Sequence, residues 1–219
     1  MFDGKTKLYL YVGMFGSGKT ELSLNTAIFL RKKQTHVAIA DIDIISQYFR
    51  SRDEKSFLEE MQIKMITVPE RYMHADLPII PPEVGGYISN PDFLTVVDVG
   101  GNEDGAVVLG SLKNFIDKVK KSTFFVVNVF RPFSATKAEI ISNIDRISQI
   151  GKIKIEYLVN NSNVGSETKF DDIKIGEEIL TEVSKETSIP LAFTSVDQDM
   201  DYEGNLPVFK IKRFMKNPW

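Results

Sequence analysis

The residues best suited to chemistry lie in the segment GMFGSGKT, from Gly13 to Thr20. The segment matches the pattern G-x-x-x-x-G-K-[ST] at every fixed position. Glycine costs conformational entropy on folding, so three glycines in six residues indicate backbone that something must approach closely. Backbone N–H groups in such a loop can surround an anion, and the N-terminus of a following helix adds its positive dipole end. The segment therefore predicts a phosphate-binding loop (Walker A).

Individual side chains in this loop have expected roles. We expect Lys19 to reach the β- and γ-phosphates of a nucleotide and the Thr20 hydroxyl to coordinate Mg²⁺. The residues expected to contact the nucleotide are Gly13, Phe15, Gly16, Ser17, Gly18, Lys19, Thr20 and Glu21. The alternative is a glycine-rich turn that Lys-Thr follows by chance, and the complete pattern in a strand-to-helix context disfavours it.

A second acidic motif is expected because a nucleoside triphosphate carries a metal ion. In FLTVVDVGG an apolar run leads to Asp98, which we expect to bind Mg²⁺ through a water molecule. Gly101 would let its backbone N–H approach the γ-phosphate and report its presence. The alternative for Asp98 is a cap of the following loop.

Asp43 is the third candidate for catalysis, beside Lys19 and Asp98. It lies two residues after the apolar run that ends at Asp41. Its carboxylate could orient the attacking water or reach the metal through water. It could equally be the N-cap of a following helix, which is a common position for aspartate.

The elements that must position these residues alternate between short apolar runs and amphipathic helical patterns. The expected strands are Lys7–Val12, His36–Asp41, Ile63–Val68, Phe93–Val99, Thr123–Val129, Lys154–Val159 and Pro190–Ser195. Most are apolar at consecutive positions, as in strands covered on both faces. We therefore expect a three-layer α/β P-loop fold, with a mainly parallel sheet of about seven strands and helices on both faces. We expect residues 1–219 to form one nucleotide-binding domain.

The composition excludes several classes of function. The net charge is −3, so no basic field attracts nucleic acid, and no nucleic-acid partner is expected. The chain has no cysteine and two histidines, which excludes disulfides and thiolate chemistry and argues against a zinc centre. No apolar run is long enough to span a bilayer, and we expect a cytoplasmic protein.

Three segments keep two interpretations each. Residues 69–92 are rich in proline and are either an irregular excursion with a short helix after Pro82 or a lid. Residues 205–219 form a basic, aromatic tail that either packs on the body, which we favour, or binds a membrane surface. Arg131 follows a strand expected to neighbour the phosphate-loop strand. It lies either at the ligand face or in solvent, and we favour solvent slightly.

The phosphate loop, DID after the second strand, VVDVGG and a later VNN together resemble the CobQ/CobB/MinD/ParA family of P-loop proteins. The resemblance extends from Lys7 to Asp197. It implies the roles given above for Asp43 and Asp98. It also implies that Asn160, with Asn161 as the adjacent candidate, hydrogen-bonds adenine. The alternative for Asn160 is a turn residue.

One position departs from this family. MinD and ParA proteins carry a second lysine early in the loop, where this chain has Met14. Methionine cannot neutralise phosphate charge, so we expect no nucleotide-switched dimer of that kind, although a homodimer stays open. The chain resembles the CobQ/CobB side of the family, which includes amide ligases, kinase-like enzymes and accessory ATPases.

The sequence therefore predicts an ATPase that binds Mg²⁺ and ATP and hydrolyses it slowly. ATP is favoured over GTP because VNNSNVG lacks the lysine and aspartate of the N-K-x-D guanine pattern. The hydrolysis would be coupled to an unknown protein or small-molecule partner. The alternatives are an ATP-dependent small-molecule kinase or ligase, and an interaction protein in which turnover is incidental.

Overall fold

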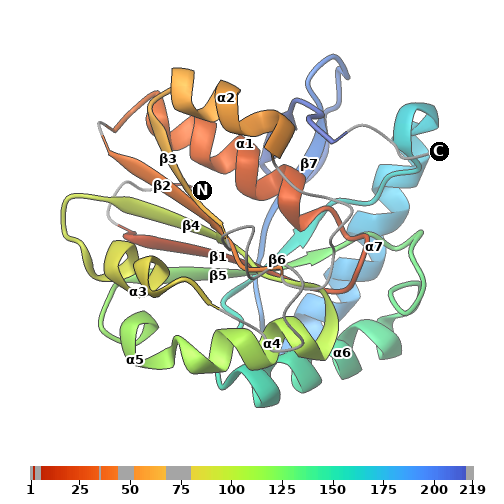
Figure 1. Cartoon of the computed structure of the whole chain (residues 1–219). Coiled ribbons are helices and arrows are strands. Elements are labelled where there is room, and N and C mark those ends of the chain that lie inside the picture. The colour runs from red at the N-terminus through yellow and green to blue at the C-terminus, as the bar shows by residue number, and fades with distance from the viewer. Residues whose placement is uncertain (1, 3–5, 35, 44–51, 68–79, 216–219) are drawn as a thin grey trace.

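The computed structural model describes residues 2, 6–34, 36–43, 52–67 and 80–215. Within them the chain forms one parallel sheet of eight strands with helices on both faces (Figure 1). The strands are β1 (Leu8–Val12), β2 (Val37–Asp41), β3 (Ile63–Ile66), β4 (Leu94–Asp98), β5 (Lys121–Val127), β6 (Tyr157–Asn160), β7 (Leu191–Asp197) and β8 (Val208–Ile211). The helices are α1 (Lys19–Arg31), α2 (Arg52–Glu60), α3 (Pro82–Ser89), α4 (Asn102–Ser111), α5 (Lys113–Ile116), α6 (Lys137–Gly151) and α7 (Phe170–Thr187), with a 3₁₀ turn at Gly165–Glu167.

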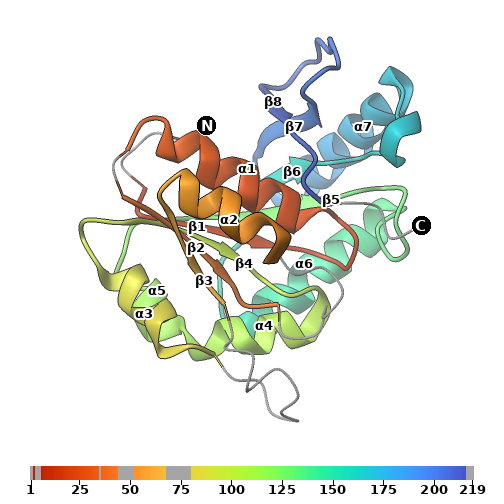
Figure 2. The ribbon, with the colours of Figure 1, turned by 45° about the horizontal axis from the view of Figure 1, so that its top comes forward.

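The two faces of the sheet bury two separate apolar clusters. Helices α1 and α2 cover one face, and α3, α4, α6 and α7 cover the other (Figures 1 and 2). Side chains alternate along β1, so that Tyr9 and Tyr11 face α1 while Leu8 and Leu10 face α4 and α6. This two-sided burial explains why the strands are apolar at consecutive positions.

The strand order places the candidate residues at one edge. The order is β3-β2-β4-β1-β5-β6-β7-β8, so β1 lies between β4 and β5. The chain runs from β1 toward β3 on one side and later from β5 toward β8 on the other. In a parallel sheet the carboxyl ends beside such a reversal form the usual ligand-binding crevice. The loop after β1, Asp98 at the end of β4 and the loop after β5 meet there.

Each of the seven predicted strands is present, and the predicted fold is confirmed. The predicted number of strands is one short, because β8 forms within the tail. The edge strand β8 buries Phe209 and Ile211 and exposes Lys210, so this part of the tail packs on the body. The tail residues 216–219 lie outside the described part.

The proline-rich segment is described from residue 80. Helix α3 begins at Pro82, as predicted, and buries Val84 and Ile88 in the core. Residues 68–79, which bear on the lid interpretation, lie outside the described part. In the described ranges, no helix combines the length and the apolar character that crossing a membrane requires.

Candidate functional site

The loop of residues 13–18 joins β1 to α1 and turns at three glycines with positive φ. Gly13, Gly16 and Gly18 have φ angles of 143°, 76° and 91°, which residues with a side chain rarely adopt. A methyl group on Gly13 would also lie 2.5 Å from the backbone oxygen of Val126 in β5. The loop therefore depends on glycine both for its turns and for its contact with the neighbouring strand.

Asn161, after β6, holds this loop in place. Its side-chain amide donates a 2.7 Å hydrogen bond to the backbone oxygen of Ser17, and its Oδ1 accepts one of 2.5 Å from Ser195. A methyl group on Gly18 would lie 2.1 Å from Asn161 Nδ2. Asn161 lines the pocket described below, but its amide is engaged with the loop. Its contact with a base stays a prediction.

Lys19 places a positive charge in a desolvated position. It is the first residue of α1 and only 6% of its surface is exposed. Its ammonium group donates a 3.0 Å hydrogen bond to the backbone oxygen of Met14. Burial lowers the pKa of Lys19, and the carboxylates of Asp98 and Asp43 act in the opposite direction. A cation with so little water around it gains strongly from an anion that binds beside it.

Asp98 offers the matching site for a metal ion. It ends β4, is 3% exposed, and its Oδ1 has no hydrogen-bond partner in the described part of the chain. Burial raises the pKa of Asp98 to about 6, although the Thr20 hydroxyl and the Lys19 ammonium lower it. A buried carboxylate oxygen without a donor is expected where a cation or its water ligand belongs. Thr20 and Asp98 therefore fit Mg²⁺, and the direct binding by Thr20 and the water-mediated binding by Asp98 stay predictions.

Asp43 lines the cavity described below, as do Lys19 and Thr20. Its backbone N–H donates a 3.0 Å hydrogen bond to Oδ1 of Asp41, and a methyl group on Gly100 would lie 3.1 Å from Asp43 Oδ1. Its charge acts on both Lys19 and Asp98, so the structure brings the three predicted catalytic residues together. The segment after Asp43, where an N-capped helix was the alternative, lies outside the described residues.

Gly101 touches the loop itself. A methyl group on Gly101 would lie 3.0 Å from the backbone N and Cα of Phe15. The Phe15 N–H in turn donates a 3.3 Å hydrogen bond to Oδ1 of Asn102, the first residue of α4. The segment after β4 thus packs directly on the loop, which would let the two move together. The approach of Gly101 to a γ-phosphate stays a prediction.

Asn160 is placed differently from its neighbour. It is fully buried, its Nδ2 donates to the backbone oxygen of Ile173 (3.0 Å), and its Oδ1 accepts from the Ser162 N–H (3.1 Å). It ties β6 to α7 and is not among the residues that line the pocket. The structure therefore gives Asn160 a structural position, and Asn161 is the member of the pair that reaches the pocket.

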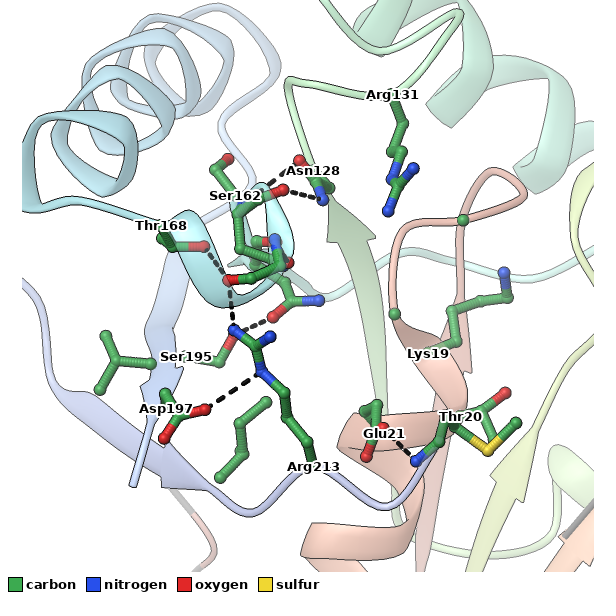
Figure 3. Close-up of a pocket in the computed structure, with 18 of the residues that line it drawn as sticks. Lys19, Thr20, Glu21, Asn128, Arg131, Ser162, Thr168, Ser195, Asp197 and Arg213 are labelled. Carbon is green, nitrogen blue, oxygen red and sulfur yellow. Dashed lines mark hydrogen bonds and ion pairs between the residues drawn. The ribbon is translucent and has the colours of Figure 1, made fainter. Parts of the chain in front are cut away.

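A cavity of about 250 Å³ extends along this edge of the sheet. The glycine loop forms one end, and residues at or after the carboxyl ends of β6, β7 and β8 form the other (Figure 3). Asp43 also lines the cavity. The second end includes Asp197 and Arg213, which lie 3.1 Å apart as an ion pair. Arg213 also donates a 2.6 Å hydrogen bond to the backbone oxygen of Gly165. Sequence reasoning missed this end of the pocket.

Glu21 fastens the C-terminal segment beside the loop. Its carboxylate accepts hydrogen bonds from the N–H groups of Phe214 (3.0 Å) and Met215 (2.6 Å). One turn further along α1, Asn25 exchanges two hydrogen bonds with the backbone of Lys212 (2.8 and 2.9 Å). The segment after β8 is therefore anchored along the first turns of α1. Glu21 lines the cavity, but its carboxylate is engaged with the backbone of Phe214 and Met215, and its contact with a nucleotide stays a prediction.

Comparison with known proteins identifies the fold. No family model matches the sequence, and no curated protein does. The cell division protein FtsY of Thermotoga maritima is similar in structure, with 16% identity and a TM-score of 0.57 over 88% of this chain and 62% of that one. Chloroplast FtsY of Physcomitrella patens is 14% identical, with a TM-score of 0.59 over 96% of this chain and 62% of that one. FlhF in complex with GTP and Mg²⁺ is 15% identical, with a TM-score of 0.58 over 94% of this chain and 69% of that one.

These identities support a likeness of fold only, and the chain spans 62% of the length of each FtsY chain. The parallel sheet, the glycine loop after β1 and the buried Lys19 all agree with that likeness. This chain therefore has the α/β fold of the P-loop nucleotide-binding proteins.

Proposed function

We propose that this protein binds a nucleoside triphosphate with Mg²⁺ at the glycine loop and hydrolyses it slowly. The observation that carries the proposal is the pair of buried, opposite charges at the start of α1 and the end of β4. Lys19 and Asp98 each act on the pKa of the other, and no described residue donates a hydrogen bond to Oδ1 of Asp98. An anion with a bound cation would satisfy both groups at once.

The roles follow from the geometry. The loop N–H groups and Lys19 would bind the terminal phosphates, and Thr20 and Asp98 would hold Mg²⁺, which would neutralise charge that develops on those phosphates. Asp43 lines the cavity together with Lys19 and Thr20, where it could orient the attacking water. The contact of Gly101 with Phe15 supports a coupling of loop occupancy to the segment that leads into α4. That segment, with Asp43, would report the nucleotide state to a partner.

We propose adenine as the base. Guanine presents two adjacent donors, an amino group and a ring N–H, and a carboxylate usually accepts hydrogen bonds from both. Adenine presents only an amino group as a donor, so it needs no such carboxylate. Among the described lining residues, the carboxylates other than Asp43 are Glu21 and Asp197. Glu21 accepts two backbone N–H groups, and both Asp197 oxygens are engaged, by Arg213 and by the Asp199 N–H.

The narrower likeness to the CobQ/CobB side of the CobQ/CobB/MinD/ParA proteins is part of this proposal. It is supported by the order of the motifs and by ATP as the expected nucleotide. The FlhF complex with GTP is the argument on the other side, because its fold matches this chain at 15% identity. Whether the protein binds adenine or guanine therefore decides between the CobQ/CobB likeness and a likeness to FlhF.

Competition between nucleotides tests the proposal. Displacement of a fluorescent ATP analogue, with and without Mg²⁺, should give roughly tenfold tighter binding of ATP than of GTP, the loss expected for an unpaired donor. Release of phosphate from ATP should be slow and should require Mg²⁺. Tighter binding of GTP would overturn the choice of adenine. Absence of Mg²⁺-dependent binding of either nucleotide would overturn the proposed function.

The binding of Mg²⁺ should depend on pH through Asp98. Because burial raises the pKa of Asp98 to about 6, the group is an anion above that pH and is protonated below it. The apparent affinity for Mg²⁺ in the presence of ATP should therefore be about tenfold weaker at pH 5 than at pH 8. Titration of Mg²⁺ against the fluorescent ATP complex at several pH values measures this.

The control is Asp98→Asn, which cannot titrate. The terminal phosphate of the nucleotide loses a proton in the same range, so the variant reports that contribution alone. The variant should bind Mg²⁺ more weakly at pH 8 and show a flatter pH profile. Identical profiles for the two proteins would show that Asp98 does not hold the ion.

A further inference from the structure

Arg131 lies in the loop after β5, next to the strand that carries the glycine loop. Its side chain lines the same cavity as Lys19 and extends toward the glycine loop (Figure 3). In the described part of the chain its guanidinium makes no ion pair, unlike Arg213, which faces the other end of the cavity with Asp197 as its partner. Among the described residues, Arg131 is therefore a cation on the pocket wall without an ion-pair partner.

The backbone around Arg131 is fixed by Asn128, which is 1% exposed. The side chain of Asn128 donates a 2.9 Å hydrogen bond to the backbone oxygen of Asn163 and accepts one of 3.0 Å from the Phe130 N–H. Its backbone oxygen accepts from the Arg131 N–H at 3.1 Å. The loop that carries Arg131 is thus tied to the segment after β6, so the backbone from which this exposed side chain extends is held in place.

The stem of Arg131 lies over the middle of the glycine loop. A methyl group on Gly16 would be 3.4 Å from Arg131 Cδ and 3.6 Å from Nε, which is van der Waals contact. The guanidinium is therefore carried along the loop that is proposed to bind the phosphates. Lys19 approaches from inside the loop, where it donates to Met14. Lys19 and Arg131 therefore lie on different sides of the glycine loop (Figure 3).

We propose that Arg131 binds the phosphate chain of the nucleotide and supplies a second cationic contact opposite Lys19. This inference rests on the proposed function. A guanidinium suits the task because its planar fork donates two parallel hydrogen bonds to phosphate oxygens. A lone Lys19 would leave much of the triphosphate charge to Mg²⁺ and backbone N–H groups. The arginine belongs to the same chain as the loop, so the contact needs no second copy of the protein.

The test compares Arg131→Met with Arg131→Lys. Methionine keeps the apolar stem over Gly16 and removes the charge, and lysine keeps the charge without the fork. Arg146→Met is the matched control, because Arg146 lies on α6 with an exposed ion pair to Glu103. The probes are Mg²⁺·ATP and inorganic triphosphate, each measured by displacement of the fluorescent ATP analogue.

Loss of charge-assisted hydrogen bonds should weaken binding of both probes by roughly tenfold or more in Arg131→Met. Arg131→Lys should recover part of that affinity, and Arg146→Met should bind as the parent does. Parental affinity of Arg131→Met for both probes would overturn the inference while leaving the proposed function intact. A loss in Arg131→Met for ATP alone, with triphosphate unchanged, would also overturn it. If the parent protein itself bound neither probe, the proposed function would fail first.

Discussion

The Lys19→Met protein should be at least as stable as the parent and should lose about a hundredfold or more of its affinity for Mg²⁺·ATP. The two effects have one cause. Lys19 is 6% exposed and burial lowers its pKa, so the empty protein holds a desolvated charge that methionine replaces with an apolar chain of similar length. The same charge is available to an incoming anion.

Thermal unfolding with and without ligand measures both effects. A ligand at a hundred times its dissociation constant should stabilise the parent by about 2.7 kcal/mol, and this shift should vanish in Lys19→Met. Lys32→Ala is the control, since Lys32 is exposed just beyond the other end of the same helix. Unchanged ligand stabilisation in Lys19→Met would contradict the assignment of the loop. A large loss of stability in the empty variant would contradict the account of the buried charge.

The central part of the fold and the shape of the glycine loop could be predicted from sequence. Strands covered on both faces leave unbroken apolar runs, and the glycines that make the loop have few other uses. The order of those runs also placed the strand before Arg131 beside β1, which the pairing of Leu8 with Lys121 confirms. Local chemistry and sheet topology agree here, and such agreement makes a prediction reliable.

Strand β8 was missed for a physical reason. It has four residues and follows Pro207, and only one of its faces is covered, so Phe209 and Ile211 alternate with exposed Lys210. Such a pattern reads equally well as a basic amphipathic tail. Its identity as a strand depends on pairing with β7, a contact with a partner that the local sequence does not reveal.

The far end of the pocket was missed as a consequence. Arg213 follows β8, and its position opposite Asp197 exists only because β7 and β8 end at the same edge. A signal was available in Asp197 itself, which lies two residues after the predicted strand Pro190–Ser195, as Asp43 lies two residues after the strand that ends at Asp41. The two adjacent asparagines, Asn160 and Asn161, also could not be told apart from the sequence. Successive side chains point to opposite sides, and the sequence alone does not say which one meets the cavity.

Replacing Gly13 by alanine should destabilise the protein by about 3 kcal/mol, even without a nucleotide. Gly13 has a φ of 143°, and its added methyl would lie 2.5 Å from the backbone oxygen of Val126. Backbone in the middle of a sheet cannot move aside as a flexible side chain can, so the loop or the pairing of β1 with β5 must shift. For a chain of this length the midpoint of unfolding should fall by about 6–12 °C.

The matched control is Gly86→Ala, which adds the same methyl group to an exposed position of α3. In the described part of the chain, no atom beyond its chain neighbours and its own helix backbone lies within 4 Å of that methyl position. Because alanine also favours a helix, the variant should be stabilised by about 0.5–1 kcal/mol. If the same added methyl group lowers stability in Gly13→Ala and raises it in Gly86→Ala, the loop after β1 is held by its contact with the backbone of β5. Similar unfolding midpoints for the two variants would mean that the loop can relax around a side chain. The packing of Gly13 against β5 would then not fix the shape that the proposed site requires.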